Sequence, residues 1–144
     1  MIHECIMESL MACAEGDVKK VLVVEDNEKN RELIVCVLKF HGYDVVEAEN
    51  GEAGVQKAIE HLPELILMDI QMPVMNGIEA LRRLKAKNET GRIKVIALTS
   101  FAMDGDGDRF IGMGFDDYIS KPINIRSLPV IIKTHIAGQN EVMT

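Results

Sequence analysis

Short apolar runs alternate with stretches of helical periodicity along most of this chain of 144 residues. We predict strands at residues 21–24, 43–48, 65–68, 95–98 and 117–120. The apolar residues between them recur with a period near 3.6, which predicts helices over residues 28–40, 50–59, 78–87 and 104–114, and one within 125–136. Regular alternation of strand and helix is typical of a parallel sheet with helices on both faces.

The apolar content of the runs indicates which strands are central. The first, third and fourth runs are continuously apolar, as expected of strands covered on both faces. The second contains Asp44 and ends near Glu47, and the fifth is short, so we place both at edges. The predicted fold class is therefore α/β, a doubly wound five-stranded parallel sheet of order 2-1-3-4-5, which is flavodoxin-like. Sites in such sheets form beyond the carboxyl ends of the strands, at the switch point between strands one and three.

Charged and hydroxyl side chains follow the predicted strands at that edge. Glu25 and Asp26 end the first strand, Asp69 the third, Thr99 the fourth and Lys121 the fifth. Two like charges about 4 Å apart repel by roughly 4 kcal/mol at an effective dielectric of about 20, so the acids require a cation. A few hard oxygen ligands with room for water suit Mg²⁺. With an amine and a hydroxyl nearby, a carboxylate nucleophile can carry a phosphoryl group.

Four sequence blocks lie at these strand ends: VLVVEDN, LILMDIQMPVMNG, VIALTSFA and DYISKPI. Together they resemble the receiver domain of bacterial response regulators, of the single-domain chemotaxis or cell-cycle type, over residues 19–137. The resemblance implies the receiver fold and a phosphoacceptor in two-component or phosphorelay signalling. Residues 1–18 and 138–144 are then an N-terminal extension and a C-terminal tail.

The resemblance also implies a role for each matching residue. Asp69 matches the phosphorylated aspartate, and Thr99, Lys121 and Tyr118 match the switch hydroxyl, the lysine and the aromatic that turns inward on activation. The metal ligands implied are the side chains of Glu25, Asp26 and Asp69 and the backbone carbonyl of Gln71, with Mg²⁺ bound and Mn²⁺ able to substitute. The Lys121–Pro122 bond matches one that is often cis.

The implied function is signalling, with self-phosphorylation and slow self-dephosphorylation as the only chemistry. The donor is a sensor histidine kinase or a histidine phosphotransfer protein. The expected output is protein binding through the face of the fourth helix, fifth strand and fifth helix, or passage of the phosphoryl group onward, because we expect no output domain. Bulky Phe101, with Gln71, flanks the expected path of attacking water and predicts slow decay of the phosphorylated state.

Simpler interpretations exist for single residues. Asp26 is also suited to cap the first helix, and Lys121 to be a solvated amine. Tyr118 also suits a half-buried core position, and Thr99 an ordinary hydroxyl at a strand end. One rival function is a haloacid-dehalogenase-type phosphatase, but such enzymes carry an acid at the position of Gln71. The other is a flavodoxin, but its phosphate-binding loop is unlike the acidic EDNEKN segment.

Composition narrows the remaining classes of protein. A net charge of −7 without a basic cluster argues against a nucleic-acid partner, and no apolar run reaches the length of a membrane span. The three cysteines are odd in number and form no CxxC motif, which favours a reduced, cytoplasmic protein. Apolar residues in 1–18 suit an amphipathic helix packed on the domain or on a second subunit in a homodimer, or else a frayed tail. The DGDGD segment fails the EF-hand spacing.

Overall fold

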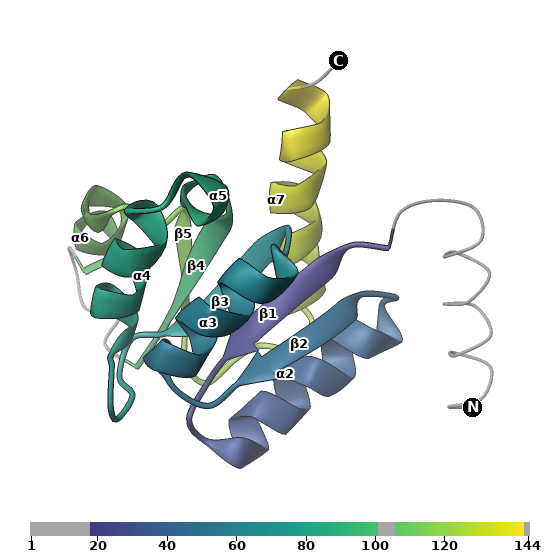
Figure 1. Ribbon diagram of the computed structural model, residues 1–144. Helices are drawn as coiled ribbons and strands as arrows, with labels where there is room; N and C mark the ends of the chain where they lie inside the picture. Colours follow the sequence, from purple (N-terminus) through teal and green to yellow (C-terminus); the bar gives the residue numbers. More distant parts are fainter. Residues whose placement is uncertain (1–17, 101–105, 143–144) are drawn as a thin grey trace.

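Five parallel strands form one sheet in the computed structural model, which describes residues 18–100 and 106–142 (Figure 1). The strand order is β2-β1-β3-β4-β5, which confirms the predicted topology and both predicted edges. The strands are β1 (Lys20–Val24), β2 (Asp44–Ala48), β3 (Leu65–Asp69), β4 (Lys94–Thr99) and β5 (Asp117–Ser120).

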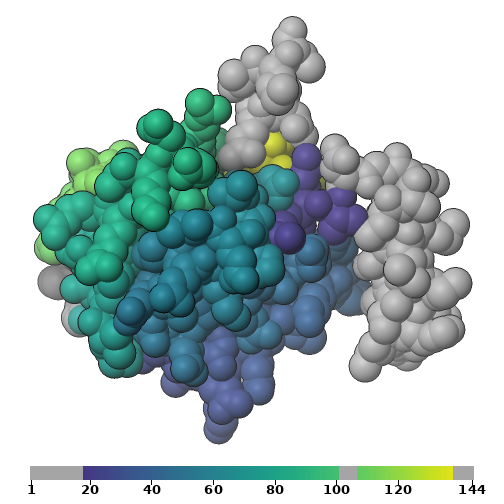
Figure 2. All heavy atoms as spheres, in the orientation of Figure 1, coloured from purple at the N-terminus to yellow at the C-terminus, as the bar shows by residue number. Residues whose placement is uncertain are grey.

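Helices cover both faces of this sheet. One apolar cluster joins the sheet to α2 and α7, and the other joins it to α3, α4 and α6. In the space-filling view, atoms of α3 and α4 cover the face toward the viewer (Figure 2). The helices are α2 (Glu28–Phe40), α3 (Gly51–His61), α4 (Gly77–Lys85), α5 (Asn88–Gly91), α6 (Asp106–Met113) and α7 (Leu128–Val142).

The three central strands are the most buried part of the chain. In β1, Val21 and Val23 face the cluster under α2 and α7, whereas Leu22 and Val24 face the other cluster, and all four are 0% exposed. Side chains alternate along a strand, so a strand covered on both faces must be apolar throughout. Each large side chain buried in this way stabilises the fold by about 1.5–3 kcal/mol. The predicted ranking of the strands is confirmed.

Asparagine side chains begin the three helices that follow β1, β2 and β3. Asn27, Asn50 and Asn76 each accept a hydrogen bond from the backbone N–H three residues later. This N-cap arrangement satisfies a donor that the helix leaves free. Asn50 thus caps the helix predicted to start at residue 50, whereas the alternative interpretation of Asp26 as a cap is wrong, because Asn27 fills that role.

Helix ends also follow local signals. Gly42, which follows the C-cap residue His41 of α2, has φ +88°, a backbone conformation that ends helices and suits glycine. Pro129 lies in the first turn of α7, where its missing N–H is harmless, and this helix begins at Leu128, within the predicted range 125–136.

Two helical features differ from the predictions. The short α5 was not predicted, because its four residues contain no apolar period; buried Thr90 anchors it by donating a hydrogen bond to the Leu84 carbonyl at 2.6 Å. α7 continues past residue 136 to Val142. The predicted N-terminal helix, Phe101, and Asp104 and Gly105 at the start of the fourth predicted helix lie outside the described residues. Among the described residues, no helix is long and apolar enough to cross a membrane.

Candidate functional site

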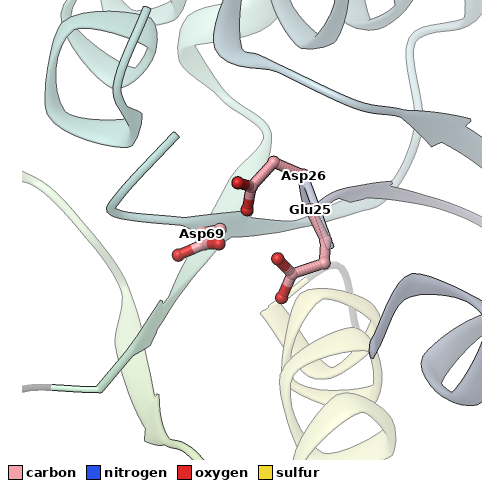
Figure 3. Close-up of side chains that lie close together, drawn as sticks. All are labelled: Glu25, Asp26 and Asp69. Carbon is pink, nitrogen blue, oxygen red and sulfur yellow. The ribbon is translucent and has the colours of Figure 1, made fainter. Parts of the chain in front are cut away.

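Three carboxylates from the ends of two neighbouring strands surround one small space (Figure 3). Glu25 and Asp26 follow β1, and Asp69 ends β3, which is paired with β1. One oxygen from each of the three lies within 4.8 Å of the others. Glu25 is 0% exposed and Asp69 is 4% exposed, whereas Asp26 is exposed to solvent. The acids predicted to meet at the switch point therefore do meet there.

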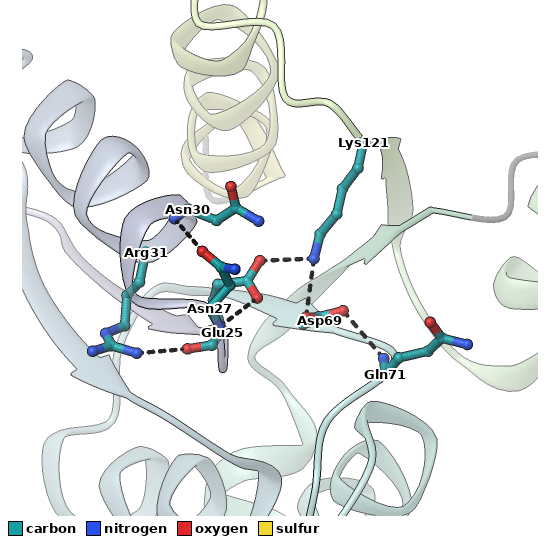
Figure 4. Close-up of polar contacts among 7 residues, drawn as sticks. All are labelled: Glu25, Asn27, Asn30, Arg31, Asp69, Gln71 and Lys121. Atoms are coloured by element: carbon teal, nitrogen blue, oxygen red, sulfur yellow. Dashed lines mark hydrogen bonds and ion pairs between the residues drawn. The ribbon is translucent and has the colours of Figure 1, made fainter.

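Lys121 reaches into this cluster from the end of β5. Its Nζ lies 3.0 Å from Oδ2 of Asp69 and 2.8 Å from Oε1 of Glu25 (Figure 4). The lysine side chain is only 16% exposed, so its interpretation as a solvated amine is wrong. The Lys121–Pro122 bond is cis, as the family resemblance implied.

Burial and neighbouring groups shift the pKa values of the two inner acids in opposite directions. Desolvation, followed by the neighbouring Glu25 carboxylate, raises the pKa of Asp69 to about 7, and Lys121 only partly opposes this. Burial also acts to raise the pKa of Glu25, but hydrogen bonds from Asp69, Lys121 and the Asn27 amide outweigh it and lower that pKa. Burial likewise opposes the charge of Lys121, yet the two acids raise its pKa. The cluster thus holds more negative charge than its single ammonium can balance.

The cluster suits a small divalent cation. Oε1 of Glu25 is buried, and the Lys121 ammonium is its ion-pair partner at 2.8 Å. That ammonium is shared with Asp69, so it balances the charge of the acids only in part. Several carboxylate oxygens converging on one space, one of them from an exposed residue open to water, are the ligands that Mg²⁺ prefers.

Gln71, Thr99 and Tyr118 take different places around this cluster. The backbone N–H of Gln71 donates to Oδ1 of Asp69 at 3.1 Å, while its side chain points away from the acids (Figure 4). Thr99 ends β4, is 2% exposed, and its carbonyl accepts the Lys121 N–H at 2.7 Å. Tyr118 is 39% exposed and lies outside the cluster.

Arg31 is a residue that the sequence analysis did not single out. Its Nη1 donates to the backbone carbonyl of Glu25 at 2.9 Å, and its Nε donates to Oε1 of Glu47 at 3.2 Å. It therefore ties the acidic loop after β1 to the end of β2. Nothing near Arg31 in the sequence indicates this, because Glu47 comes from a different strand.

A hollow of about 390 Å³ opens beside Lys121. Asn30 and Leu33 of α2 line one part of it, and the segment after β5 lines the other. Its described lining is Asn30, Leu33, Ser100, Lys121, Pro122 and Ile123.

Comparison with known proteins identifies the family. A model of the response regulator receiver domain matches residues 21–133. The polar-differentiation response regulator DivK of Brucella anthropi is 42% identical over 118 residues, which cover 82% of this chain and 96% of DivK. The hybrid signal transduction histidine kinase I of Dictyostelium discoideum is 43% identical over 126 residues and 82% of this chain, which spans only 7% of that kinase.

Solved structures agree with this assignment. The receiver domain of a sensor histidine kinase from Pseudomonas aeruginosa, solved with a magnesium ion coordinated in its active site cleft, is 33% identical with a TM-score of 0.77 over 84% of this chain and 99% of that one. A CheY-like receiver domain protein from Methanospirillum hungatei is 31% identical with a TM-score of 0.78 over 87% of this chain and 98% of that one. The chain belongs to the response regulator receiver domain family of two-component signalling.

Proposed function

We propose that Asp69 is the phosphoacceptor of this receiver domain. Its donor is a phosphohistidine on a sensor histidine kinase or a histidine phosphotransfer protein. One observation carries the proposal: the Asp69 carboxylate is buried at the switch point of the sheet, with an ammonium 3.0 Å away and two further acids beside it. A carboxylate placed for structure alone has no need of this combination.

The side chains of Glu25, Asp26 and Asp69, with the backbone carbonyl of Gln71, would hold Mg²⁺. The three carboxylates that converge on one space beside a single ammonium support this assignment, as does the magnesium ion in the related receiver domain. When bound, the ion supplies positive charge that neutralises the oxygens of the incoming phosphoryl group. Mn²⁺ accepts similar oxygen ligands and substitutes for it.

The chain's own groups then perform the transfer. A carboxylate oxygen of Asp69 attacks the phosphorus, a P–O bond forms, and the P–N bond to the donor histidine breaks with its electron pair going to the imidazole. The Gln71 N–H holds Oδ1 in place during this step. The Lys121 ammonium, already 3.0 Å from Oδ2, balances charge that develops on the phosphoryl oxygens. The product is an acyl phosphate.

The hollow beside Lys121 supports a docking place for the donor. It extends from Leu33, which is 45% exposed, to Lys121, whose ammonium contacts Asp69. A partner seated there brings its phosphohistidine to the carboxyl edge of the sheet. This is the edge where Asp69 lies.

Phosphorylation then changes the surface made by α6, β5 and α7. We infer that Thr99 contacts the phosphoryl group and that Tyr118 turns inward, which shifts an existing two-state equilibrium. Exposed Ile111, Met113 and Val130 on these helices supply apolar area for a downstream protein or for a second copy of the chain. The proposal places this chemistry in the cytoplasm, with no nucleic acid or membrane taking part.

Intact mass after incubation with acetyl phosphate tests the proposal. We expect the mass of one phosphoryl group to be added with Mg²⁺ or Mn²⁺ and not with EDTA. Asp69→Asn must abolish the gain, while Asp44→Asn, which removes an exposed acid on β2, must not. A phosphohistidine donor is used in parallel, because it supplies the proposed chemistry directly. Failure with both donors contradicts the proposal, and so does an undiminished gain in Asp69→Asn.

A further inference from the structure

The ring of Tyr118 lies against the backbone of α6 at Gly107. Gly107 is buried near the start of α6, which runs beside β5 (Figure 1). A Cβ added to Gly107 would lie 2.6 Å from Oη of Tyr118, and closer still to Cε1 and Cζ of the ring. Real Cβ atoms do not approach other atoms this closely. The observed ring position therefore requires a glycine at residue 107.

Both backbones at this contact are held by other interactions. β5 is paired with β4, with Tyr118 opposite Ala97, and Ile119 is buried in the core. α6 is anchored by Phe110, which is 4% exposed and packs edge-to-face on Phe115. The Tyr118 ring is thus the part that is free to yield, by rotating to another staggered side-chain position.

The sheet register gives the ring another direction to take. Tyr118 lies beside Ala97, and Thr99 lies on the same face of β4 because side chains alternate along a strand. Ala97 is small and buried. A ring that leaves Gly107 can rotate along this row toward Thr99, which is 2% exposed, or outward into the solvent that Tyr118 already meets at 39% exposure.

We propose that Gly107 is a positioning residue that seats the Tyr118 ring in the resting protein, and that any side chain at residue 107 displaces the ring toward its activated position. The seat itself rests on the geometry alone. The link to activation rests on the proposed function, in which Tyr118 turns inward after phosphorylation. Residue 107 thus sets the resting balance between the two states.

Fluorine NMR of a single tyrosine tests the seat directly. The chain has two tyrosines and no tryptophan, so Tyr43→Phe leaves Tyr118 as the sole site for 3-fluorotyrosine. Gly112→Ala is the matched control, because it lies in the same helix and its Cβ meets no atom within 4 Å. In metal-free, unphosphorylated protein we expect Gly107→Ala to shift the Tyr118 resonance and Gly112→Ala to leave it in place. An unshifted resonance in Gly107→Ala overturns the proposal.

Thermal melting separates this contact from general effects on α6. Alanine for glycine inside a helix is ordinarily stabilising, so Gly112→Ala is expected to raise the melting temperature. Gly107→Ala is expected to raise it less in the presence of Tyr118 than in a Tyr118→Ala background, where no ring has to move. The same effect in both backgrounds overturns the proposal.

Phosphorylation of the Tyr43→Phe protein labelled at Tyr118, the parent of these variants, separates the seat of the ring at Gly107 from its link to activation. Mg²⁺ with acetyl phosphate is expected to move the parent resonance in the direction that Gly107→Ala produces without phosphorylation. If the parent becomes phosphorylated and its resonance moves in the opposite direction, the link to activation is overturned while the seat stands. If the parent takes up no phosphoryl group from acetyl phosphate or from a phosphohistidine donor, it is the proposed function that fails, since the metal-free comparison still tests the seat.

Discussion

Replacing Asp69 with asparagine removes one charge from a buried cluster and keeps the size of the side chain. One oxygen from each of the three acids lies within 4.8 Å of the others, which corresponds to a repulsion of about 3 kcal/mol per pair at an effective dielectric of about 20. Attraction to the Lys121 ammonium at 3.0 Å stabilises the Asp69 carboxylate by about 5 kcal/mol at the same effective dielectric. The repulsion of Asp69 by Glu25 and Asp26, added to the cost of burying its charge, exceeds its attraction to Lys121. We therefore expect Asp69→Asn to raise the free energy of unfolding by at least about 2 kcal/mol in the absence of metal.

The gain must depend on pH in a defined direction. The pKa of Asp69 is raised from 3.8 to about 7 in the folded protein, chiefly by burial. A raised pKa means that the folded state binds the extra proton, so the wild-type chain loses stability as pH rises from about 4 through 7. The asparagine variant has no such loss. Its advantage is expected to be near zero at about pH 4 and complete above about pH 7.

Urea or thermal unfolding in EDTA at both ends of this pH range measures the effect, with Asp44→Asn as the control for net charge. A gain of about 2 kcal/mol corresponds to roughly 5–10 °C for a domain of this size. Mg²⁺ at about ten times its dissociation constant is expected to stabilise the wild-type chain by about 1.4 kcal/mol and the variant by less. The reasoning is refuted if Asp69→Asn is no more stable than wild type near neutral pH, or if its advantage does not grow with pH.

Three further changes test other contacts. Lys121→Met leaves two buried acids without their ammonium and is expected to lower the free energy of unfolding by about 3 kcal/mol, measured by urea unfolding; an unchanged midpoint contradicts the ion pairs. Leu62 has φ 47° and is 52% exposed, so Leu62→Gly is expected to stabilise the fold by about 1 kcal/mol while Leu62→Ala, which keeps the strained backbone, does not. Arg31→Met frees the loop after β1 and is expected to weaken Mg²⁺ binding several-fold by calorimetry, whereas exposed Arg126→Met does not; equal affinities rule out a positioning role for Arg31.

Much of the fold could be predicted because its signals are local. A strand covered on both faces must be apolar throughout, and residues 21–24, 65–68 and 95–98 are. Asn50 caps α3 through the backbone N–H only three residues later, so the signal for this helix start is local. Once the strand order is known, Glu25, Asp26 and Asp69 must end at the same edge of the sheet. The cluster of acids therefore follows from topology.

The remaining features depend on tertiary contacts that leave no local pattern. Arg31 meets Glu47 across two elements, and no periodicity indicates that pairing. Gly107 resembles an ordinary glycine in a weak helix until the Tyr118 ring is placed on it. Asp26 and Asn27 are both good caps, and only the backbone geometry decides between them.

The most direct test of the central claim is to locate the phosphoryl group. The protein is phosphorylated by a phosphohistidine donor with Mg²⁺ and reduced with borohydride, which converts an aspartyl phosphate to homoserine, and the peptides are sequenced by mass spectrometry. We expect homoserine at residue 69 alone, and none when EDTA replaces Mg²⁺. Homoserine at Asp26 or at another aspartate, with residue 69 unmodified, would contradict it.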